Sequence, residues 1–407
     1  MNESNEPRSM NATPEGDRVR IAFMGRRNAG KSSLLNAIAG QPVSIVSPVP
    51  GTTTDPVKKA MELLPLGPAV LVDTAGLDDD QADVGSLRAQ RARLELRSAD
   101  LVLIVTDPAT GAGACERELM ERLREAGTAF FLVVNKCDEA PMPASALVAL
   151  SEAIKAPVHA VSAQTGGGVA ELKRAISEVK LDEPASQRII GDKLARGDVV
   201  VLVAPVDSAA PKGRLILPQQ QTIRDILDSG CIAVVAQVSE LARALASLTA
   251  PPRMVVTDSQ AFAEVRAIVP LDVELTSFSI LFARYKGDFD VLKAGVDALD
   301  RLKDGDKVLI VEGCTHRRQC DDIGTVKIPK WLKAYTRKEL ALEFASGAGW
   351  PEDLSPYALI IHCGGCMLPR REVKRRILDA QRAGVPIANY GLLIAKLRGV
   401  FDSVATV

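Results

Sequence analysis

A glycine-rich turn of sequence GRRNAGKS, residues 25–32, constrains the fold of this chain more than any other feature. It follows an apolar, strand-like run, VRIAFM, and leads into a helical pattern, KSSLLNAIAG. Gly25 and Gly30 permit the backbone to curl so that its N–H groups face phosphate oxygens, and the helix N-terminus adds a favourable dipole. Lys31 is placed to reach the β- and γ-phosphates, and Ser32 to bind magnesium. The sequence therefore predicts a P-loop that binds a nucleoside triphosphate.

Two later motifs supply the rest of a magnesium and γ-phosphate site. GTTTD offers Thr53 as a second magnesium ligand from a switch loop. DTAGL follows a strand-like run, and its Asp73 can hold magnesium through a water molecule. The N–H of Gly76, in the same motif, can sense the γ-phosphate. The order of the three motifs along the chain is that of a nucleotide hydrolase with switch loops.

A further pair of motifs selects the base. In NKCD, Asp138 can accept hydrogen bonds from guanine N1 and N2, which adenine cannot offer, while Asn135 and Lys136 brace the pocket. SAQTG supplies backbone donors to the guanine carbonyl, so GTP is predicted over ATP. The predicted catalytic residues are Asn28, Lys31, Thr53 and Gly76. The predicted nucleotide-binding residues are Gly25, Asn28, Ala29, Gly30, Lys31, Ser32, Ser33, Thr53, Asp73, Gly76, Asn135, Lys136, Asp138, Ser162, Ala163 and Gln164.

Alternating strand-like and helix-like segments recur along the whole chain and predict an α/β protein. The first set predicts a doubly wound parallel sheet with helices on both faces. The pattern restarts twice after a polar segment, and among the later segments RKELALEFASG is predicted as a helix. The predicted spans are a disordered leader at 1–18, a GTPase domain at 19–180, a linker at 181–198, a small middle α/β domain at 199–270 and a C-terminal α/β domain at 271–407.

Composition excludes several classes of protein. The formal net charge of −1 gives no broad basic field for nucleic acid, so no nucleic-acid partner is predicted. The apolar runs have the length of strands, and the polar N-terminus has no signal-like apolar core. We therefore expect no membrane association and a cytoplasmic location. In that compartment the seven cysteines should be reduced, and clustered ones indicate metal binding.

Soft ligands cluster after two strand-like runs near the C-terminus. KVLIVEGCTH ends in Cys314 and His316, and LIIHCGGC contains His362, Cys363 and Cys366. Carboxyl ends of neighbouring parallel strands share one edge of a sheet, where ligands bind in open α/β folds. Two of the three histidines and three of the seven cysteines are thus expected in one small volume. The sequence predicts a metal centre at that edge.

The spacing leaves the kind of centre open. C-x-H with C-x-x-C fits zinc as well as an iron–sulfur cluster, and the third alternative is a buried structural role without metal. Zinc would favour four closed ligands, whereas a cluster on three cysteines would leave one iron open or weakly capped. Cys320 is interpreted as a bystander, although it is near enough in sequence to be a fourth thiolate.

The nucleotide motifs resemble those of the TrmE–Era branch of GTPases. Asn28 stands where potassium-dependent members have an asparagine ligand, and Leu77 stands where Ras-like switches place the water-positioning glutamine. The resemblance implies a potassium ion, held by Asn28 and by switch-loop carbonyls between Ser44 and Gly51, in place of an arginine finger. It also implies slow turnover in the isolated domain.

The chain as a whole resembles the HydF family of FeFe-hydrogenase maturation GTPases, through its GTPase motifs, the segment PKGRLILPQQQTIRDILD and the C-x-H…H-C-x-x-C pattern. This resemblance implies a 4Fe–4S cluster on Cys314, Cys363 and Cys366, with His316 or His362 as a possible fourth ligand. It implies a scaffold that holds a transient di-iron unit and passes it to apo FeFe-hydrogenase. Radical-SAM maturation enzymes would be partners, and the middle domain would form a homodimer or higher oligomer.

Three other functions share some of these motifs. An RNA-modification or ribosome-assembly GTPase with a C-terminal zinc module would share every GTPase motif, but the neutral charge and the two additional α/β domains disfavour it. A nickel- or zinc-trafficking GTPase should carry its ligands near the nucleotide or in a histidine-rich tract. A binding module with an inactive GTPase is disfavoured by the intact phosphate and guanine motifs.

Overall fold

The computed structural model describes residues 15–41, 57–74, 95–181, 188–205, 215–313, 322–347 and 349–404. The chain divides into two compact units, Met1–Glu183 and Pro184–Val407, and the second unit contains two sheets. All three sheets are built mainly from buried parallel strands joined by helices, as the sequence predicted for an α/β protein.

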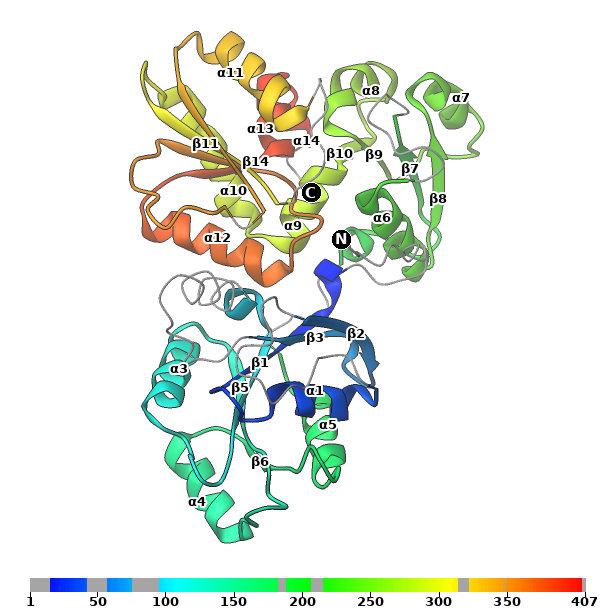
Figure 1. Ribbon diagram of the computed structural model, residues 1–407. Helices are drawn as coiled ribbons and strands as arrows, with labels where there is room; N and C mark the ends of the chain where they lie inside the picture. Colours follow the sequence, from blue (N-terminus) through cyan, green and yellow to red (C-terminus); the bar gives the residue numbers. More distant parts are fainter. Residues whose placement is uncertain are drawn as a thin grey trace, which may run out of the picture. The chain divides into compact units, whose positions relative to one another are not determined.

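The first unit contains a six-stranded sheet of order β2-β3-β1-β4-β5-β6 (Figure 1). Helices α1 and α5 pack on one face and α3 on the other, so the sheet is doubly wound. The elements are β1 (Val19–Met24), α1 (Lys31–Ala39), β2 (Val57–Leu63), β3 (Gly67–Asp73), β4 (Leu101–Thr106), α3 (Ala114–Glu125), β5 (Ala129–Val134), α4 (Ala144–Ile154), β6 (Val158–Ala160) and α5 (Val169–Ser177).

One strand departs from the predicted parallel sheet. β2 pairs antiparallel with β3 along its whole length, from Val57 against Asp73 to Leu63 against Gly67. Its residues alternate between half-buried and exposed, because β2 is the edge strand and covers the core with one face only. Antiparallel pairing needs no crossover helix, so the short connection Leu64–Leu66 is sufficient.

The sheet of the middle domain has the order β10-β9-β7-β8, with every pair parallel. The elements are β7 (Val199–Val203), α6 (Leu217–Asp228), β8 (Ile232–Ala236), α7 (Leu241–Ala246), β9 (Met254–Thr257), α8 (Phe262–Ile268) and β10 (Glu274–Ser277). β10 begins four residues after the predicted border at residue 270, so that border excludes one of the two outer strands of the sheet. The domain borders themselves stay predictions.

The end of the predicted linker is packed against this domain. The side chains of Ile189 and Ile190 are buried with residues of β7, of β9 and of the helix α9 (Phe278–Lys286). The Asp225 carboxylate accepts hydrogen bonds from the backbone N–H groups of Ile190 and Gly191, at 2.8 and 2.7 Å. Polar composition predicted a linker over the whole segment. Burial of these two apolar side chains is more favourable in free energy than their exposure to water, so this end of the segment packs against the domain.

The C-terminal sheet has the order β12-β11-β13-β14 and is wholly parallel. The helix α9 (Phe278–Lys286) precedes its elements, which are α10 (Phe289–Val296), β11 (Lys307–Glu312), the π-helix η6 (Ile323–Lys327), α11 (Ile328–Thr336), β12 (Ala341–Ser346), β13 (Leu359–His362), α12 (Arg370–Arg382), β14 (Ile387–Asn389), α13 (Tyr390–Leu397) and α14 (Phe401–Val404). β11 and β13 are neighbours, as the two cysteine-bearing runs predicted.

The predicted helix in RKELALEFASG is wrong, because residues 341–346 form β12. Alanine, leucine and glutamate favour a helix locally. In the folded chain, however, β12 pairs with β11 over six positions, from Lys307 against Ala341 to Glu312 against Ser346. This pairing provides partners for backbone groups along the outer edge of β11, and such tertiary pairing overrides a weak local propensity.

Candidate functional site

The P-loop is closely packed at both glycines of its motif, Gly25 and Gly30. Gly25 has φ +147° and Gly30 has φ +88°, which are conformations that favour glycine. A Cβ atom on Gly25 would lie 2.1 Å from the backbone oxygen of Val105, and one on Gly30 would lie 2.2 Å from Nδ2 of Asn135. Both glycines are therefore required by space as well as by backbone angle.

Lys31 begins helix α1 and folds back over the loop. Its Nζ donates hydrogen bonds to the backbone oxygens of Gly25 and Arg26, at 3.0 and 2.8 Å. The ammonium group is thus held among the loop backbone at the N-terminus of α1, where the helix dipole also favours an anion. Asn28, the predicted potassium ligand, is exposed in this loop and has φ +63°.

The two predicted magnesium ligands that the structure describes lie together. Ser32 Oγ, in the first turn of α1, donates a hydrogen bond to Oδ2 of Asp73 at 2.5 Å. Asp73 is fully buried at the carboxyl end of β3, so its position is fixed by the sheet. Thr53 and Gly76, the two predicted switch residues, lie outside the described residues, as do Leu77 and the segment from Ser44 to Gly51.

Asn135 connects the P-loop to the loop that is predicted to read the base. Its Nδ2 donates to the backbone oxygen of Ala29 at 3.1 Å, and its Oδ1 accepts from the N–H of Ala163 at 2.9 Å. Ser162 Oγ accepts from the N–H of Thr165 at 3.1 Å, which closes the second loop. The side chain of Asn135 therefore fixes the P-loop relative to the loop that contains Ala163.

The other residues predicted to read the base lie beside Asn135 in the sequence or in the loop that it contacts. Asp138 and Gln164 are exposed, and Lys136 has φ +60° with its Nζ 4.0 Å from Oδ2 of Asp107. Burial raises the pKa of Asp107, but hydrogen bonds from Thr110 and the charge of Lys136 outweigh it, and the pKa is lowered overall. The carboxylate of Asp138 is exposed and is therefore accessible to a ligand.

The second candidate site is the loop after β13. Val311 of β11 pairs with His362 of β13, so the carboxyl ends of both strands meet at one edge. The Sγ of Cys363 accepts hydrogen bonds from the N–H groups of Gly313 and Gly365, at 3.0 and 3.4 Å. Burial raises the pKa of the Cys363 thiol, and these two N–H groups oppose the rise. Hydrogen bonds of this kind to a cysteine sulfur also occur around iron–sulfur clusters.

The remaining predicted ligands of this centre are only partly described. Cys314, His316 and Cys320 lie outside the described residues. Gly313, which precedes Cys314 in the sequence, is one of the two residues whose N–H groups contact the Cys363 sulfur. Among the described residues no three metal-ligating side chains gather in one place. The cavity behind the loop is lined by His362, Cys363 and Gly364 and by apolar side chains of α9, α10 and α12.

A buried lysine that sequence reasoning missed holds the second cysteine. Lys286, at the end of α9, is fully buried, and its Nζ donates to the backbone oxygens of Cys366 and Leu368, at 2.9 and 2.8 Å. Its signal in the sequence is its spacing. Lys286 follows Phe282 by four residues and Ala283 by three, so it falls on the apolar face of its helix.

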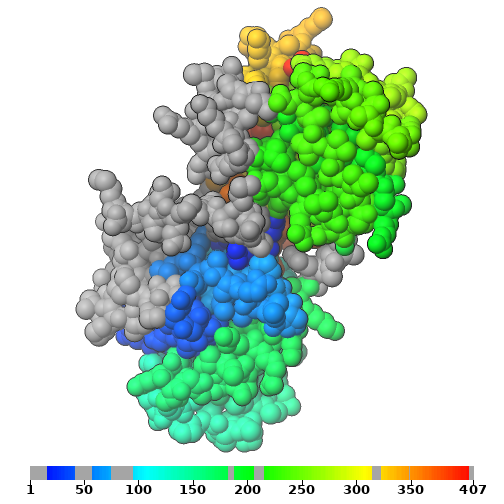
Figure 2. Space-filling view, turned by 90° about the vertical axis from the view of Figure 1, so that its right-hand side faces the viewer, coloured from blue at the N-terminus to red at the C-terminus, as the bar shows by residue number. Residues whose placement is uncertain are grey.

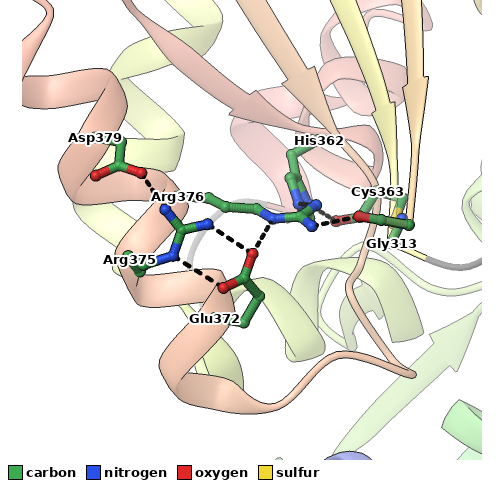
Figure 3. Close-up of polar contacts among 8 residues, drawn as sticks. Gly313, His362, Cys363, Glu372, Arg375, Arg376 and Asp379 are labelled. Atoms are coloured by element: carbon green, nitrogen blue, oxygen red, sulfur yellow. Dashed lines mark hydrogen bonds and ion pairs between the residues drawn. The ribbon is translucent and has the colours of Figure 1, made fainter. Parts of the chain in front are cut away.

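A buried arginine that sequence reasoning also missed contacts the predicted ligand His362 (Figure 3). Arg376 Nη1 lies 3.1 Å from Nε2 of His362, and its Nε donates to Oε1 of Glu372 at 2.7 Å. Burial, and then the charge of Arg376, lower the pKa of His362 to about 4. Arg376 lies on the same helical face as the buried Val373, and this spacing is the sequence signal for it.

Comparison with known families assigns the part of the chain that carries these cysteines. Residues 189–287 match the family model described as the hydrogen maturase F dimerization domain, and residues 290–407 match the hydrogen maturase F tetramerization domain. The chain belongs to the HydF family. Residues 20–136 match a further family model, described as a 50S ribosome-binding GTPase. These three matches confirm the resemblance inferred from the motifs of the chain.

Curated relatives that are themselves GTPases match about two fifths of this HydF chain. The tRNA modification GTPase MnmE of Symbiobacterium thermophilum is 40% identical over 173 residues, which are 42% of this chain and 37% of the relative. GTPase Era of Nostoc sp. is 32% identical over 171 residues, 41% of this chain and 52% of the relative. The chain thus spans between about a third and a half of the length of these relatives. The matches agree with a GTPase domain that binds GTP and magnesium.

Solved structures match this chain with low TM-scores. Era of Aquifex aeolicus bound to GDP and aluminium fluoride has a TM-score of 0.37 at 18% identity, covering 82% of this chain and 94% of that chain. The G domain of the T. maritima iron transporter FeoB has a TM-score of 0.32 at 28% identity, covering 40% of this chain and 98% of that chain. The family assignment therefore rests on the family models.

The two HydF family models also bear on the assembly of the chain. They describe domains of dimerization and tetramerization, which supports a homodimer or higher oligomer. Among the helices that the structure describes, none combines the length and the apolar character needed to cross a bilayer.

Proposed function

We propose that this HydF-family chain is a GTP-hydrolysing scaffold that holds a 4Fe–4S cluster and a di-iron precursor, and that transfers the precursor to apo FeFe-hydrogenase. The observation that carries the proposal is the contact of Cys363 Sγ with the N–H of Gly313 where β11 and β13 end together. The HydF family models over residues 189–407 support it. Radical-SAM maturation enzymes are the proposed partners that supply the precursor.

The proposed cluster ligands are the thiolates of Cys314, Cys363 and Cys366. The described part of this set fits such a cluster, because Gly313 and Gly365 donate N–H groups to Cys363 Sγ and Lys286 fixes the carbonyl of Cys366. Three thiolates leave one iron able to accept a further ligand, which is the property a cluster platform needs. The fourth position is open to His316, to His362 or to a ligand from outside the chain.

In the proposed GTPase site, each described residue has one task. Lys31 provides positive charge for the β- and γ-phosphates, while Ser32 and Asp73, with Thr53, hold magnesium. Asp138 reads guanine, and Asn135 keeps the base-reading loop against the phosphate loop. Gly76 is the proposed sensor of the γ-phosphate. We propose no residue of the described part as a general base.

The middle domain is proposed as the dimerisation surface. Strand β8 is one of the two outer strands of its sheet, and the side chains of Ile232 and Val235 on it are 53% and 47% exposed. The side of this domain that carries β8 and α7 is turned toward the viewer in Figure 2, in green. Exposed apolar side chains on an edge strand favour association with a second sheet.

The proposal is tested by reconstituting the full chain with iron and sulfide under anaerobic conditions. We expect a brown protein with about four irons and four sulfides per chain, since a 4Fe–4S cluster has that composition. Cys363→Ala and Cys366→Ala should each lose most of this iron, because a ligand thiolate is removed. Cys115→Ala, which changes an exposed cysteine of α3, is the matched control and should keep it. Colourless protein that contains only zinc would support the RNA-modification alternative.

Potassium dependence is a separate proposal for Asn28. We expect GTP hydrolysis in potassium chloride to exceed that in sodium chloride by at least about tenfold, or roughly 1.4 kcal/mol of barrier. Asn28→Ala should remove the difference, because the exposed amide oxygen in the P-loop is the proposed potassium ligand. Asn36→Ala, on α1, is the control. Equal rates in the two salts would contradict the proposal.

A further inference from the structure

The predicted ligand His362 is enclosed in a buried polar network. His362 is 3% exposed at the end of β13, and Arg376 is 2% exposed on α12. We propose that Arg376 is a positioning residue that holds the His362 imidazole away from metal, so that His362 does not supply the fourth ligand of the cluster. This inference rests on the proposed cluster function. It excludes His362 from the candidates that the proposed function leaves open for the fourth ligand.

The hydrogen bonds of His362 fix the tautomer of its ring. Nδ1 lies 2.7 Å from the backbone oxygen of Cys363, and a carbonyl oxygen can only accept, so Nδ1 carries the proton. Nε2 lies 3.1 Å from Nη1 of Arg376, and a guanidinium can only donate, so Nε2 presents its lone pair to Arg376. A neutral imidazole has one ring lone pair for a metal. In His362 that lone pair is already used.

Arg376 is itself held from several sides. Nε donates to Oε1 of Glu372 at 2.7 Å, and Nη2 donates to the backbone oxygen of Gly347 at 2.7 Å. The guanidinium carbon also lies 5.2 Å from the centre of the Trp350 ring. Glu372 in turn accepts two hydrogen bonds from Arg375, at 2.9 and 2.8 Å. Moving Arg376 away from His362 would disturb these contacts together (Figure 3).

Coordination of iron by His362 would therefore have two costs. The ring would have to leave Arg376, and a buried guanidinium N–H would lose its acceptor. The bond from Nδ1–H to the backbone oxygen of Cys363 stabilises the present position of the ring. It fixes the peptide group that follows Cys363 while the ring remains away from the metal. The network thus orders the loop and leaves the fourth position to a ligand from outside the network.

The first test uses pulsed electron paramagnetic resonance of the reduced, reconstituted full chain. We expect His362→Gln to leave the nitrogen hyperfine couplings of the cluster unchanged. Arg376→Leu frees Nε2, so it should introduce an imidazole nitrogen coupling, which should be lost in the Arg376→Leu, His362→Gln double variant. Arg375→Leu is the matched control, because the guanidinium of Arg375 contacts Glu372 and Asp379 in place of His362. A wild-type coupling that disappears in His362→Gln would overturn the inference.

The second test requires no cluster, and it does not depend on whether the Arg376 variants fold. Nuclear magnetic resonance of the cluster-free chain with isotopically labelled histidine should show His362 as the Nδ1–H tautomer, assigned by its absence in His362→Gln. An Nε2–H tautomer or an imidazolium at His362 would overturn the inference. Failure of the wild type to assemble any cluster would instead refute the proposed function, while this measurement would still decide the state of His362. If Arg376→Leu does not fold, Arg376→Lys should show a changed His362 signal, and an unchanged signal would count against the positioning role.

Discussion

Replacing Lys31 with alanine is expected to lower kcat for GTP hydrolysis by about 10²–10³-fold, the usual effect of removing one preorganised charge from a transition state. Nζ of Lys31 is held by the backbone oxygens of Gly25 and Arg26, inside the loop that faces the phosphates. The group is therefore in place before the nucleotide binds, and little reorganisation is needed. Phosphate release under saturating GTP measures the effect.

GTP affinity should fall in the same variant, by roughly 10–100-fold, because a charge-assisted hydrogen bond contributes about 1.5–3 kcal/mol. Lys180→Ala, which changes an exposed lysine after the end of α5, is the control and should leave both quantities unchanged. Hydrolysis by the Lys31 variant at the wild-type rate would mean that the P-loop of this chain does not support catalysis in the proposed way.

Changing Asp138 to asparagine is expected to reverse the base preference of the site. The exposed carboxylate of Asp138 can accept from N1–H and from the exocyclic amine of guanine. Loss of two charge-assisted bonds should weaken GTP binding by about 10²-fold or more. Xanthine has a carbonyl in place of that amine, to which an asparagine amide can donate, so xanthosine triphosphate should bind the variant better than GTP does.

Competition between labelled GTP and xanthosine triphosphate measures this reversal directly. Glu139→Gln is the matched control, because it removes one negative charge from the exposed neighbouring position without altering the predicted base contact. If Asp138→Asn and Glu139→Gln weaken GTP binding equally, the effect is a general loss of charge and the assignment of Asp138 is wrong.

Motifs whose chemistry is local were predictable from the sequence. Gly25, Gly30 and Lys31 act through the backbone of one short loop. Ser32 and Asp73 meet because Ser32 lies shortly after β1 and Asp73 ends β3, which are neighbouring parallel strands. The meeting of the β11 and β13 ends was predictable for the same reason. In each case a strand register, set by continuous apolar runs, brings distant positions to a common edge.

Segments at the edges of sheets were harder to predict. β12 has the composition of a helix and becomes a strand because β11 offers an unpaired edge. β10 extends the middle sheet beyond the predicted border because it pairs with β9. β12 is largely half-buried or exposed, so its sequence carries little of the apolar pattern that marks central strands. β10 is mostly buried, but its four residues end in Thr276 and Ser277, which do not continue an apolar run.

The sequence by itself determined that this chain has a GTP site at one end and a cysteine-bearing sheet edge at the other, because glycine turns, ligand types and buried strands encode those features within a few residues. Only the tertiary structure decided what surrounds the cysteines. Five of the first seven residues of α12 are basic, and packing against β13 selected Arg376 as the one whose guanidinium meets His362. Lys286 reaches Cys366 across 80 residues of sequence for the same reason. A buried charge is stable only where the fold provides its acceptors, and those acceptors are backbone and side-chain groups that no local pattern identifies.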